Sequence, residues 1–224
     1  AAEPLAHAPG LESELAELHY TRGNLYFARG DIAACGVEHN AALACAQSLD
    51  DPAWEARATS GLADAAYAEG RMRTALARFR HCVALCDAHG LTRVAIPNRI
   101  MVGHCQVYIT EFDAGMVDIL AARALAVQVG DRHAEMFTLE SEGLLLAFCD
   151  RHAAAACPLE RGLALAEAIG ARRYQSTLRL AMAEAALAAG RSDEARDHIE
   201  RALALSRETG MRFCGPLLLG LKAR

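Results

Sequence analysis

The stretch Gly23-Asn24-Leu25-Tyr26-Phe27-Ala28-Arg29-Gly30-Asp31 reads as the end of one helix, a glycine stop and an acidic start to the next helix. The same pattern of a helix end followed by a helix start recurs every 40 residues, at residues 63–71, 103–111, 143–151 and 183–191. A fixed period of this length is typical of stacked helical repeats, in which each unit buries its apolar face against its neighbours.

Aligning the chain at this period predicts two sets of turns, each at a position where a left-handed residue would end a helix. The turns between repeats fall at Asp50, Gly90, Gly130, Gly170 and Gly210. The turns within repeats fall at Gly30, Gly70, Thr110, Asp150 and Gly190. The segments between these turns have apolar residues at helical spacing, so each repeat is predicted to be a pair of helices.

The same alignment predicts core columns of small or apolar residues, which let helices approach closely. In the first helices, the small column is Gly23, Ala63, Gly103, Gly143 and Ala183. In the second helices, the predicted core columns are Ala42, Cys82, Ala122, Gly162 and Ala202; Ala44, Ala84, Ala124, Ala164 and Ala204; and Cys45, Leu85, Leu125, Leu165 and Leu205.

These patterns predict an all-α fold, a right-handed α-solenoid of five helix pairs with a terminal capping helix. We expect a lead-in over residues 1–11, repeats over 12–50, 51–90, 91–130, 131–170 and 171–210, and the terminal helix over 211–224. Two prolines bear on this register. Pro97 is expected in the first turn of its helix, where the missing N–H is harmless. Pro158 lies deep in the repeat and predicts a helix that is kinked or starts late, near Cys157.

The motif Gly-x-x-Tyr-x-x-x-Gly-Asp at Gly23, Tyr26, Gly30 and Asp31, with Ala75 and Phe79 in the second repeat, resembles the tetratricopeptide repeat (TPR). Longer runs, over residues 18–27, 82–90 and 207–216, resemble the C-terminal TPR region of large bacterial proteins that carry a class III adenylate/guanylate cyclase domain and an AAA/STAND-type ATPase domain. That resemblance implies a regulatory module whose catalytic domains lie elsewhere in a parent protein.

Composition and charge argue against several classes of protein. A hydrophobic content of 53% with 23% charged residues excludes a disordered chain. With a net charge of −5 we expect no nucleic-acid partner, and the basic group Arg71, Arg73, Arg78 and Arg80 is interpreted as a solvated helix face. No apolar run approaches the roughly 20 residues of a membrane span, so we expect a cytoplasmic protein that binds no membrane. The eight cysteines contain no Cys-x-x-Cys pair and are expected to be reduced thiols.

Clusters that could carry chemistry have simpler interpretations. Cys82, Cys86 and His89 share a helix face, but the equivalent positions of other repeats are mostly small or apolar, so we interpret them as interior residues and expect no metal. Cys35 likewise occupies a column of small residues. The acidic group around Asp113 is expected to begin a helix. No nucleophile or hydrolase motif is present, and we expect no catalytic residue and no cofactor.

The remaining candidate site is the concave groove that the first helices of such an array would line. Its predicted residues, which are polar or aromatic apart from Met101, are expected to contact no neighbouring helix: Asn24, Phe27, Asp64, Tyr67, Met101, His104, Tyr108, Glu140 and Glu184. The sequence leaves two functions open. The first is a protein-interaction and regulatory module that binds a protein or peptide segment, including the parent's own ATPase or cyclase domains. The second is a small-ligand sensor that binds a metabolite in the groove and controls an attached ATPase or transcription regulator. A homodimer through the terminal helix is a further expectation.

Overall fold

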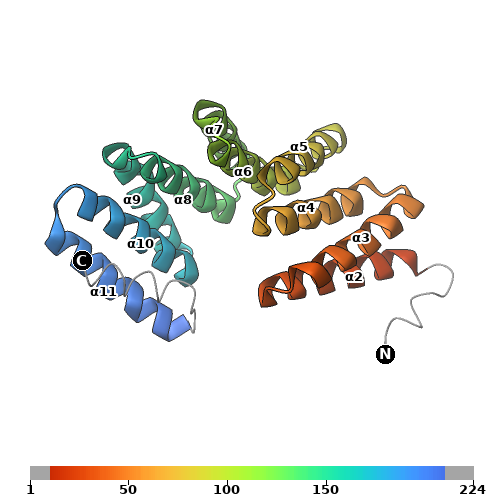
Figure 1. Ribbon diagram of the computed structural model, residues 1–224, viewed down its shortest axis with the longest axis horizontal. Coiled ribbons are helices and arrows are strands. Elements are labelled where there is room, and N and C mark those ends of the chain that lie inside the picture. Colours follow the sequence, from red (N-terminus) through yellow and green to blue (C-terminus); the bar gives the residue numbers. More distant parts are fainter. Residues whose placement is uncertain (1–10, 210–224) are drawn as a thin grey trace. The chain divides into compact units, whose positions relative to one another are not determined.

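A computed structural model describes residues 11–209, and this part of the chain folds into ten α-helices joined by short turns (Figure 1). The helices are α2 (Glu12–Arg29), α3 (Ile32–Leu49), α4 (Pro52–Ala68), α5 (Met72–His89), α6 (Thr92–Tyr108), α7 (Phe112–Gln128), α8 (Arg132–Phe148), α9 (His152–Ala168), α10 (Arg172–Ala188) and α11 (Ser192–Thr209). The predicted all-α class is confirmed. The expected lead-in and terminal capping helix fall almost wholly outside the described residues.

The helices belong to two compact units that meet inside α7, between Asp118 and Ile119. In the first unit each of α2 to α5 packs against the next helix, and the first helices of successive pairs also contact one another, α2 with α4 and α4 with α6. The second unit repeats this pattern with α8, α9, α10 and α11, in which α8 also contacts α10. Each unit therefore places its first helices side by side.

Nine of the ten predicted turn positions are confirmed, and the tenth, Gly210, lies outside the described residues. Gly30, Gly70, Gly90, Gly130, Gly170 and Gly190 all have positive φ, and so do the three non-glycine residues that the alignment placed at turns, Asp50, Thr110 and Asp150. The motif's aspartates then start the next helix: the Asp31 carboxylate accepts a hydrogen bond from the Ala34 N–H at 3.1 Å, and Asp131 caps α8 in the same way. The left-handed residues therefore end one helix, and the aspartates that follow them begin the next.

Two of the four predicted core columns are confirmed, and the column of Cys45, Leu85, Leu125, Leu165 and Leu205 is only partly buried. The first-helix column of Gly23, Ala63, Gly103, Gly143 and Ala183 is buried throughout, as is the second-helix column that contains Cys82. The column of Ala44, Ala84, Ala124, Ala164 and Ala204 is exposed, so its assignment to the core is wrong. Two residues beyond a buried position is about 200° around a helix, which puts this column on the opposite face.

Side chains from the second helices explain the small first-helix residues. A Cβ atom at Gly23 would lie 2.7 Å from Cε1 of His39, a buried residue of α3, and one at Gly61 would overlap the same imidazole. At Gly143, an added Cβ would overlap the side chain of Leu159. The repeat thus depends on a bulky second-helix residue that fits against glycine on the neighbouring helix.

Both proline predictions fail in part. Pro97 is the sixth residue of α6, which begins at Thr92, so it lies inside the helix and not in the first turn. The helix that contains Pro158 begins at His152, so the predicted late start near Cys157 is wrong. Each proline removes only one N–H donor, and burial of the surrounding helix offsets that loss.

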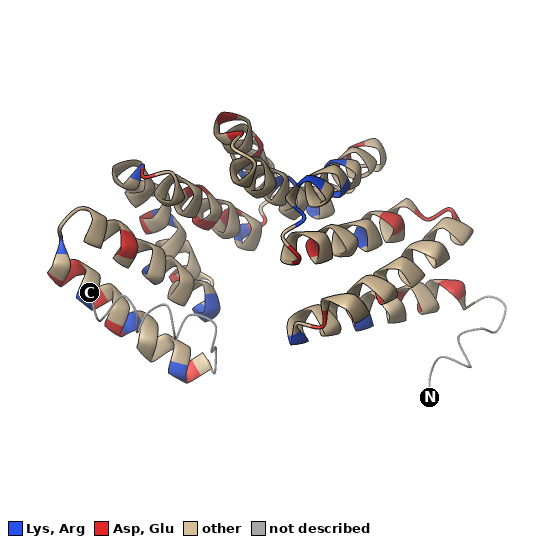
Figure 2. Ribbon diagram, in the orientation of Figure 1, with Lys and Arg blue, Asp and Glu red and all other residues tan. Residues whose placement is uncertain are grey.

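No helix in residues 11–209 is long and apolar enough to cross a membrane. Arginines and acidic residues are both spread over many helices, and α5 carries Arg73, Arg78 and Arg80 (Figure 2). The interpretation of this basic group as a solvated face is wrong for Arg78, which is partly buried and donates a hydrogen bond to the Leu62 carbonyl oxygen at 2.8 Å.

Candidate functional site

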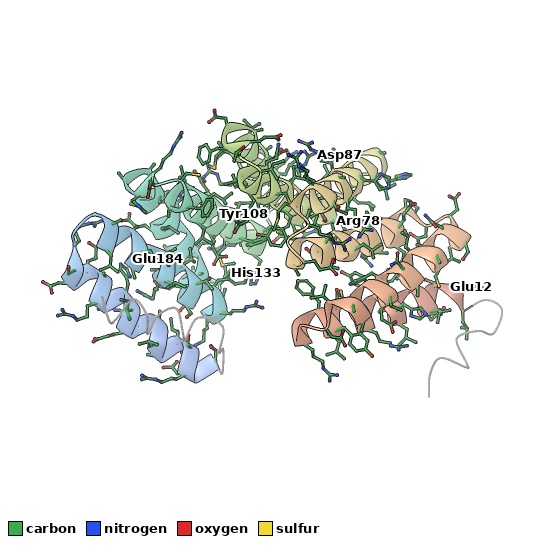
Figure 3. The ribbon with its side chains drawn as sticks, in the orientation of Figure 1. Glu12, Arg78, Asp87, Tyr108, His133 and Glu184 are labelled. Carbon is green, nitrogen blue, oxygen red and sulfur yellow. The ribbon has the colours of Figure 1, made fainter. Side chains whose placement is uncertain are left out.

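The nine predicted groove residues differ widely in exposure. Asn24 and Glu184 are exposed, and the rings of Phe27 and Tyr108 are 41% and 46% exposed. Figure 3 shows Tyr108 and Glu184 among the side chains of α6 and α10. Glu140, by contrast, is only 5% exposed. The other four are partly buried, namely Asp64, Tyr67, Met101 and His104.

In the first unit, four of these residues form one group, which we call the α4/α6 cluster: Asp64, Tyr67, His104 and Tyr108. Tyr67 follows Asp64 by three residues on α4, and Tyr108 follows His104 by four residues on α6, so each pair shares a helix face. The two tyrosine rings join the pairs, with centroids 6.1 Å apart in a T-shaped arrangement. Tyr67 also packs against the buried core around Phe79, as Met101 does. The expectation that these side chains would contact no neighbouring helix is therefore wrong for the tyrosines.

Asp64 makes no hydrogen bond and no ion pair with any described residue. Burial raises the pKa of its carboxyl to about 7, because the charged form loses solvation and gains no partner. The groups that sense its charge are thiols on three other helices, Cys35, Cys82 and Cys105, whose own pKa values are raised by burial first and by Asp64 as a further cause.

On the neighbouring helix α6, the pKa of His104 is shifted in the opposite direction. Its Nε2 atom is buried and has no hydrogen-bond partner. Burial lowers the pKa of the imidazole to about 4, so the ring is neutral at physiological pH. A neutral ring can accept a hydrogen bond at Nε2 when its proton is on Nδ1. Equivalent positions of α4 and α6 thus hold an acid and an imidazole, each with unused hydrogen-bonding capacity.

The second unit contains a related group with a different outcome, which we call the α8/α10 cluster: Phe137, Glu140, Tyr174 and Thr177. The Thr177 hydroxyl donates a hydrogen bond to Glu140 Oε1, and the rings of Phe137 and Tyr174 lie 6.2 Å apart. Burial raises the pKa of Glu140 to about 7 even though Thr177 and Arg173 favour its charged form. Sequence reasoning missed the three partners. The signal was available, because residues 137 and 177 occupy one column of the alignment.

A third polar group, around α2 and α3, was also missed. Glu38 is buried on α3, where it accepts from Arg22 at 2.8 Å and lies 2.7 Å from His19 Nδ1. The next residue, His39, contacts the Tyr20 ring, and burial lowers the pKa of its imidazole. These contacts are internal and hold α2 to α3, so they mark the group as structural.

The thiols support the interpretation of interior packing. Cys82 and Cys86 are fully buried, and Cys82 donates to the Ala56 carbonyl oxygen at 3.2 Å. His89, which the alignment placed inside, is exposed at the end of α5. Its exposure follows from its place in the last turn, one residue before the left-handed Gly90. Among the residues that the structure describes, no three His, Cys, Asp or Glu side chains are placed to hold a metal ion, and every described cysteine is a free thiol.

Comparison with known proteins gives the fold its context. No protein-family model matches the sequence, and no curated protein matches it. Solved structures do match. A Rap protein complexed with competence and sporulation factor shares 15% identity at a TM-score of 0.73, over 99% of this chain and 68% of that one. The TPR-like repeats of a Podosopora anserina kinesin light chain share 14% identity at a TM-score of 0.65, and the match covers 90% of this chain and 98% of that one.

A third match is a STAND protein with a tetratricopeptide repeat sensor from Pyrococcus horikoshii, which shares 12% identity at a TM-score of 0.69. The match covers 97% of this chain but only 37% of that protein. At these identities the likeness concerns the fold alone. The chain has the fold of TPR-like helical repeats.

Proposed function

We propose that this chain is a protein-interaction and regulatory module that binds a protein or peptide segment along its first helices. The observation that carries the proposal is the α4/α6 cluster, in which Asp64 and His104 have unused hydrogen-bonding capacity beside a half-exposed Tyr108 ring. Aromatic side chains with one apolar face and one polar tip are the residue type that most often anchors protein partners.

We further propose that the partner is a domain of the same parent protein, a bacterial signalling protein with nucleotide cyclase and STAND-type ATPase domains. The sequence runs that resemble such proteins support this, and so does the fold of the STAND protein with a tetratricopeptide repeat sensor. In this arrangement the repeats would control the ATPase by binding it in one of its states.

The test is calorimetric titration of this chain with the ATPase domain encoded in the same open reading frame. Tyr108→Ala should weaken binding by about 2 kcal/mol, roughly 30-fold, as expected for a buried aromatic anchor. The matched control is Val37→Ala, because Val37 is an exposed apolar residue, 69% accessible, on the second helix α3. Absence of binding by the unmodified chain, or equal losses in the two variants, would count against the proposal.

A further inference from the structure

The strongest unassigned feature of the first unit is the carboxyl group of Asp64. It is partly buried, no basic side chain of residues 11–209 pairs with it, and its oxygens remain open to solvent. A partly desolvated carboxylate without a cationic partner is stabilised by an incoming cation. The cluster therefore contains an acceptor that is ready for a donor from outside.

The surroundings of Asp64 favour one kind of donor. The groups that sense its charge from α3, α5 and α6 are thiols, Cys35, Cys82 and Cys105, which supply no positive charge. On its own helix, Tyr67 lies one turn away and contacts Tyr108 of α6. Aromatic faces beside a carboxylate attract cations, and they offer nothing to an anion.

His104 adds a second, independent point. Its Nε2 atom is buried without a partner on the helix next to Asp64, and the ring is neutral. A neutral imidazole beside an unpaired acid does not repel a cation. An ammonium group carries three donors and no acceptor, so its chemistry matches both acceptors of this cluster, a carboxylate and an imidazole nitrogen.

We propose that the α4/α6 cluster receives the cationic side chain of a lysine or arginine from the bound protein segment, with Asp64 as its counter-ion. This inference rests on the proposed function and names the chemistry of the partner at that site. The carboxylate supplies the charge, His104 Nε2 supplies a second acceptor, and the rings of Tyr67 and Tyr108 cover the aliphatic stem of the partner's side chain.

Binding of this kind depends on pH in a defined direction. Asp64 must be ionised to pair with a cation, so affinity should rise as pH increases through about 7 and fall below it. His104 stays neutral over this range because its pKa lies at about 4. The thiols of Cys35, Cys82 and Cys105 stay protonated, since burial raises their pKa values.

The experiment uses two short alanine-based peptides that differ at one position, lysine in one and norleucine in the other. Norleucine keeps the aliphatic stem and lacks the charge. Binding to the isotope-labelled chain is followed by NMR at about pH 8, where Asp64 is ionised. We expect the lysine peptide to bind at least about tenfold more tightly than the norleucine peptide, with shifts at the amides of Asp64, Tyr67 and His104.

Two variants locate the effect. Asp64→Asn keeps the shape of the side chain and should abolish the preference for lysine, whereas Glu140→Gln, which changes the buried carboxyl of the second unit, should leave it unchanged. A third probe, butylammonium, separates a peptide from a free amine. The lysine peptide should bind more tightly than butylammonium, and equal affinities would overturn the assignment to a protein side chain.

Equal binding of the lysine and norleucine peptides to the unmodified chain would overturn the inference without any variant. The failure can be told apart from failure of the proposed function. If the ATPase domain binds and Asp64→Asn leaves that binding unchanged, the interaction module stands and the cation site does not.

Discussion

Two carboxyl groups on first helices, Asp64 in the first unit and Glu140 in the second, have the same pKa of about 7 for the same main reason, which is burial. They differ in what surrounds them. Glu140 accepts a hydrogen bond from Thr177 and has Arg173 nearby, while Asp64 has neither donor nor cation. A raised pKa alone therefore does not distinguish a carboxyl group with a structural role from one that can bind a partner. The two differ in whether a donor within the fold already bonds to the carboxylate.

The comparison extends to the neighbouring aromatic pairs. The ring centroids lie 6.1 Å apart in the first cluster and 6.2 Å apart in the second, but Tyr108 is 46% exposed, whereas Phe137 and Tyr174 are both partly buried. The α8/α10 cluster thus holds two helices together, and the α4/α6 cluster keeps an accessible side.

The largest effect should come from adding one methyl group where the first unit is closest packed. Gly61→Ala places a Cβ on the imidazole of the buried His39, so we expect a loss of about 2–3 kcal/mol in the free energy of unfolding. Gly36→Ala is the matched control, because nothing lies within 4 Å of its added Cβ and helix propensity should make it neutral or stabilising. Chemical denaturation measures both. Equal stabilities of the two variants would contradict the close packing.

The second prediction concerns the pH dependence of stability. The folded-state pKa of Asp64 is raised from 3.8 to about 7, so the folded state binds more protons in this interval and stability is lost as pH rises through it. Asp64→Asn removes that loss. Relative to the unmodified protein, we expect it to gain about 2 kcal/mol on going from acidic to mildly alkaline pH, a value reduced for the solvent access of this side chain.

Thermal or urea denaturation of both proteins across this pH interval measures the gain, and His104→Gln serves as a control. The pKa of His104 is lowered to about 4, so its ionisation lowers stability only below the unfolded value of 6.5, in the opposite direction. A stability difference between Asp64→Asn and the unmodified protein that stays constant with pH would show that Asp64 is ionised without penalty.

The third prediction concerns the hydrogen bond from Thr177 to Glu140 in the second unit. Thr177→Val removes the hydroxyl that favours the charged form of Glu140, so the pKa of Glu140 should rise further, by roughly one unit. The pKa of Asp64 should not move. Carbon-13 NMR of the two carboxyl groups measures both values in one sample, and a Glu140 pKa that stays in place would remove the contrast between the clusters.

The smallest effect is expected at two turns. Thr110 and Asp150 adopt positive φ, which glycine tolerates best and a β-branched residue tolerates worst. Thr110→Gly should therefore stabilise the protein by about 1 kcal/mol, and Asp150→Gly by only a few tenths, because aspartate accepts this conformation more readily. Differential scanning calorimetry of the two variants gives the comparison. A larger gain at Asp150 would show that side-chain contacts, and not backbone strain, govern these turns.

The turns and the small columns were predictable because each rests on local backbone geometry repeated at a fixed period. Gly23 and Ala63 lie in one register, and each faces a helix neighbour that requires a small residue. The exposed Ala44 column was not predictable in this way. Alanine suits both a packed interface and a solvated helix face, so a column of alanine alone cannot separate them.

The candidate site was predictable in its first unit and less so in its second. Tyr67 and Tyr108 were identified as first-helix aromatics, but their mutual contact depends on how α4 packs against α6. Glu140 looked like a groove residue because its position carries a charge, but it is buried and its hydrogen-bond donor is Thr177, 37 residues away. Such pairing depends on tertiary packing, which the alignment of repeats does not contain.

The most direct test of the contrast between the clusters is a carbon-13 titration of the Asp64 and Glu140 carboxyl groups, with and without the lysine peptide. A cation that pairs with Asp64 should lower its pKa by about one unit or more, because an opposite charge favours the ionised form. The pKa of Glu140 should not change, because Thr177 already donates a hydrogen bond to its carboxylate. An Asp64 pKa that stays at about 7 in the presence of saturating peptide, or equal shifts at both carboxyl groups, would contradict the account.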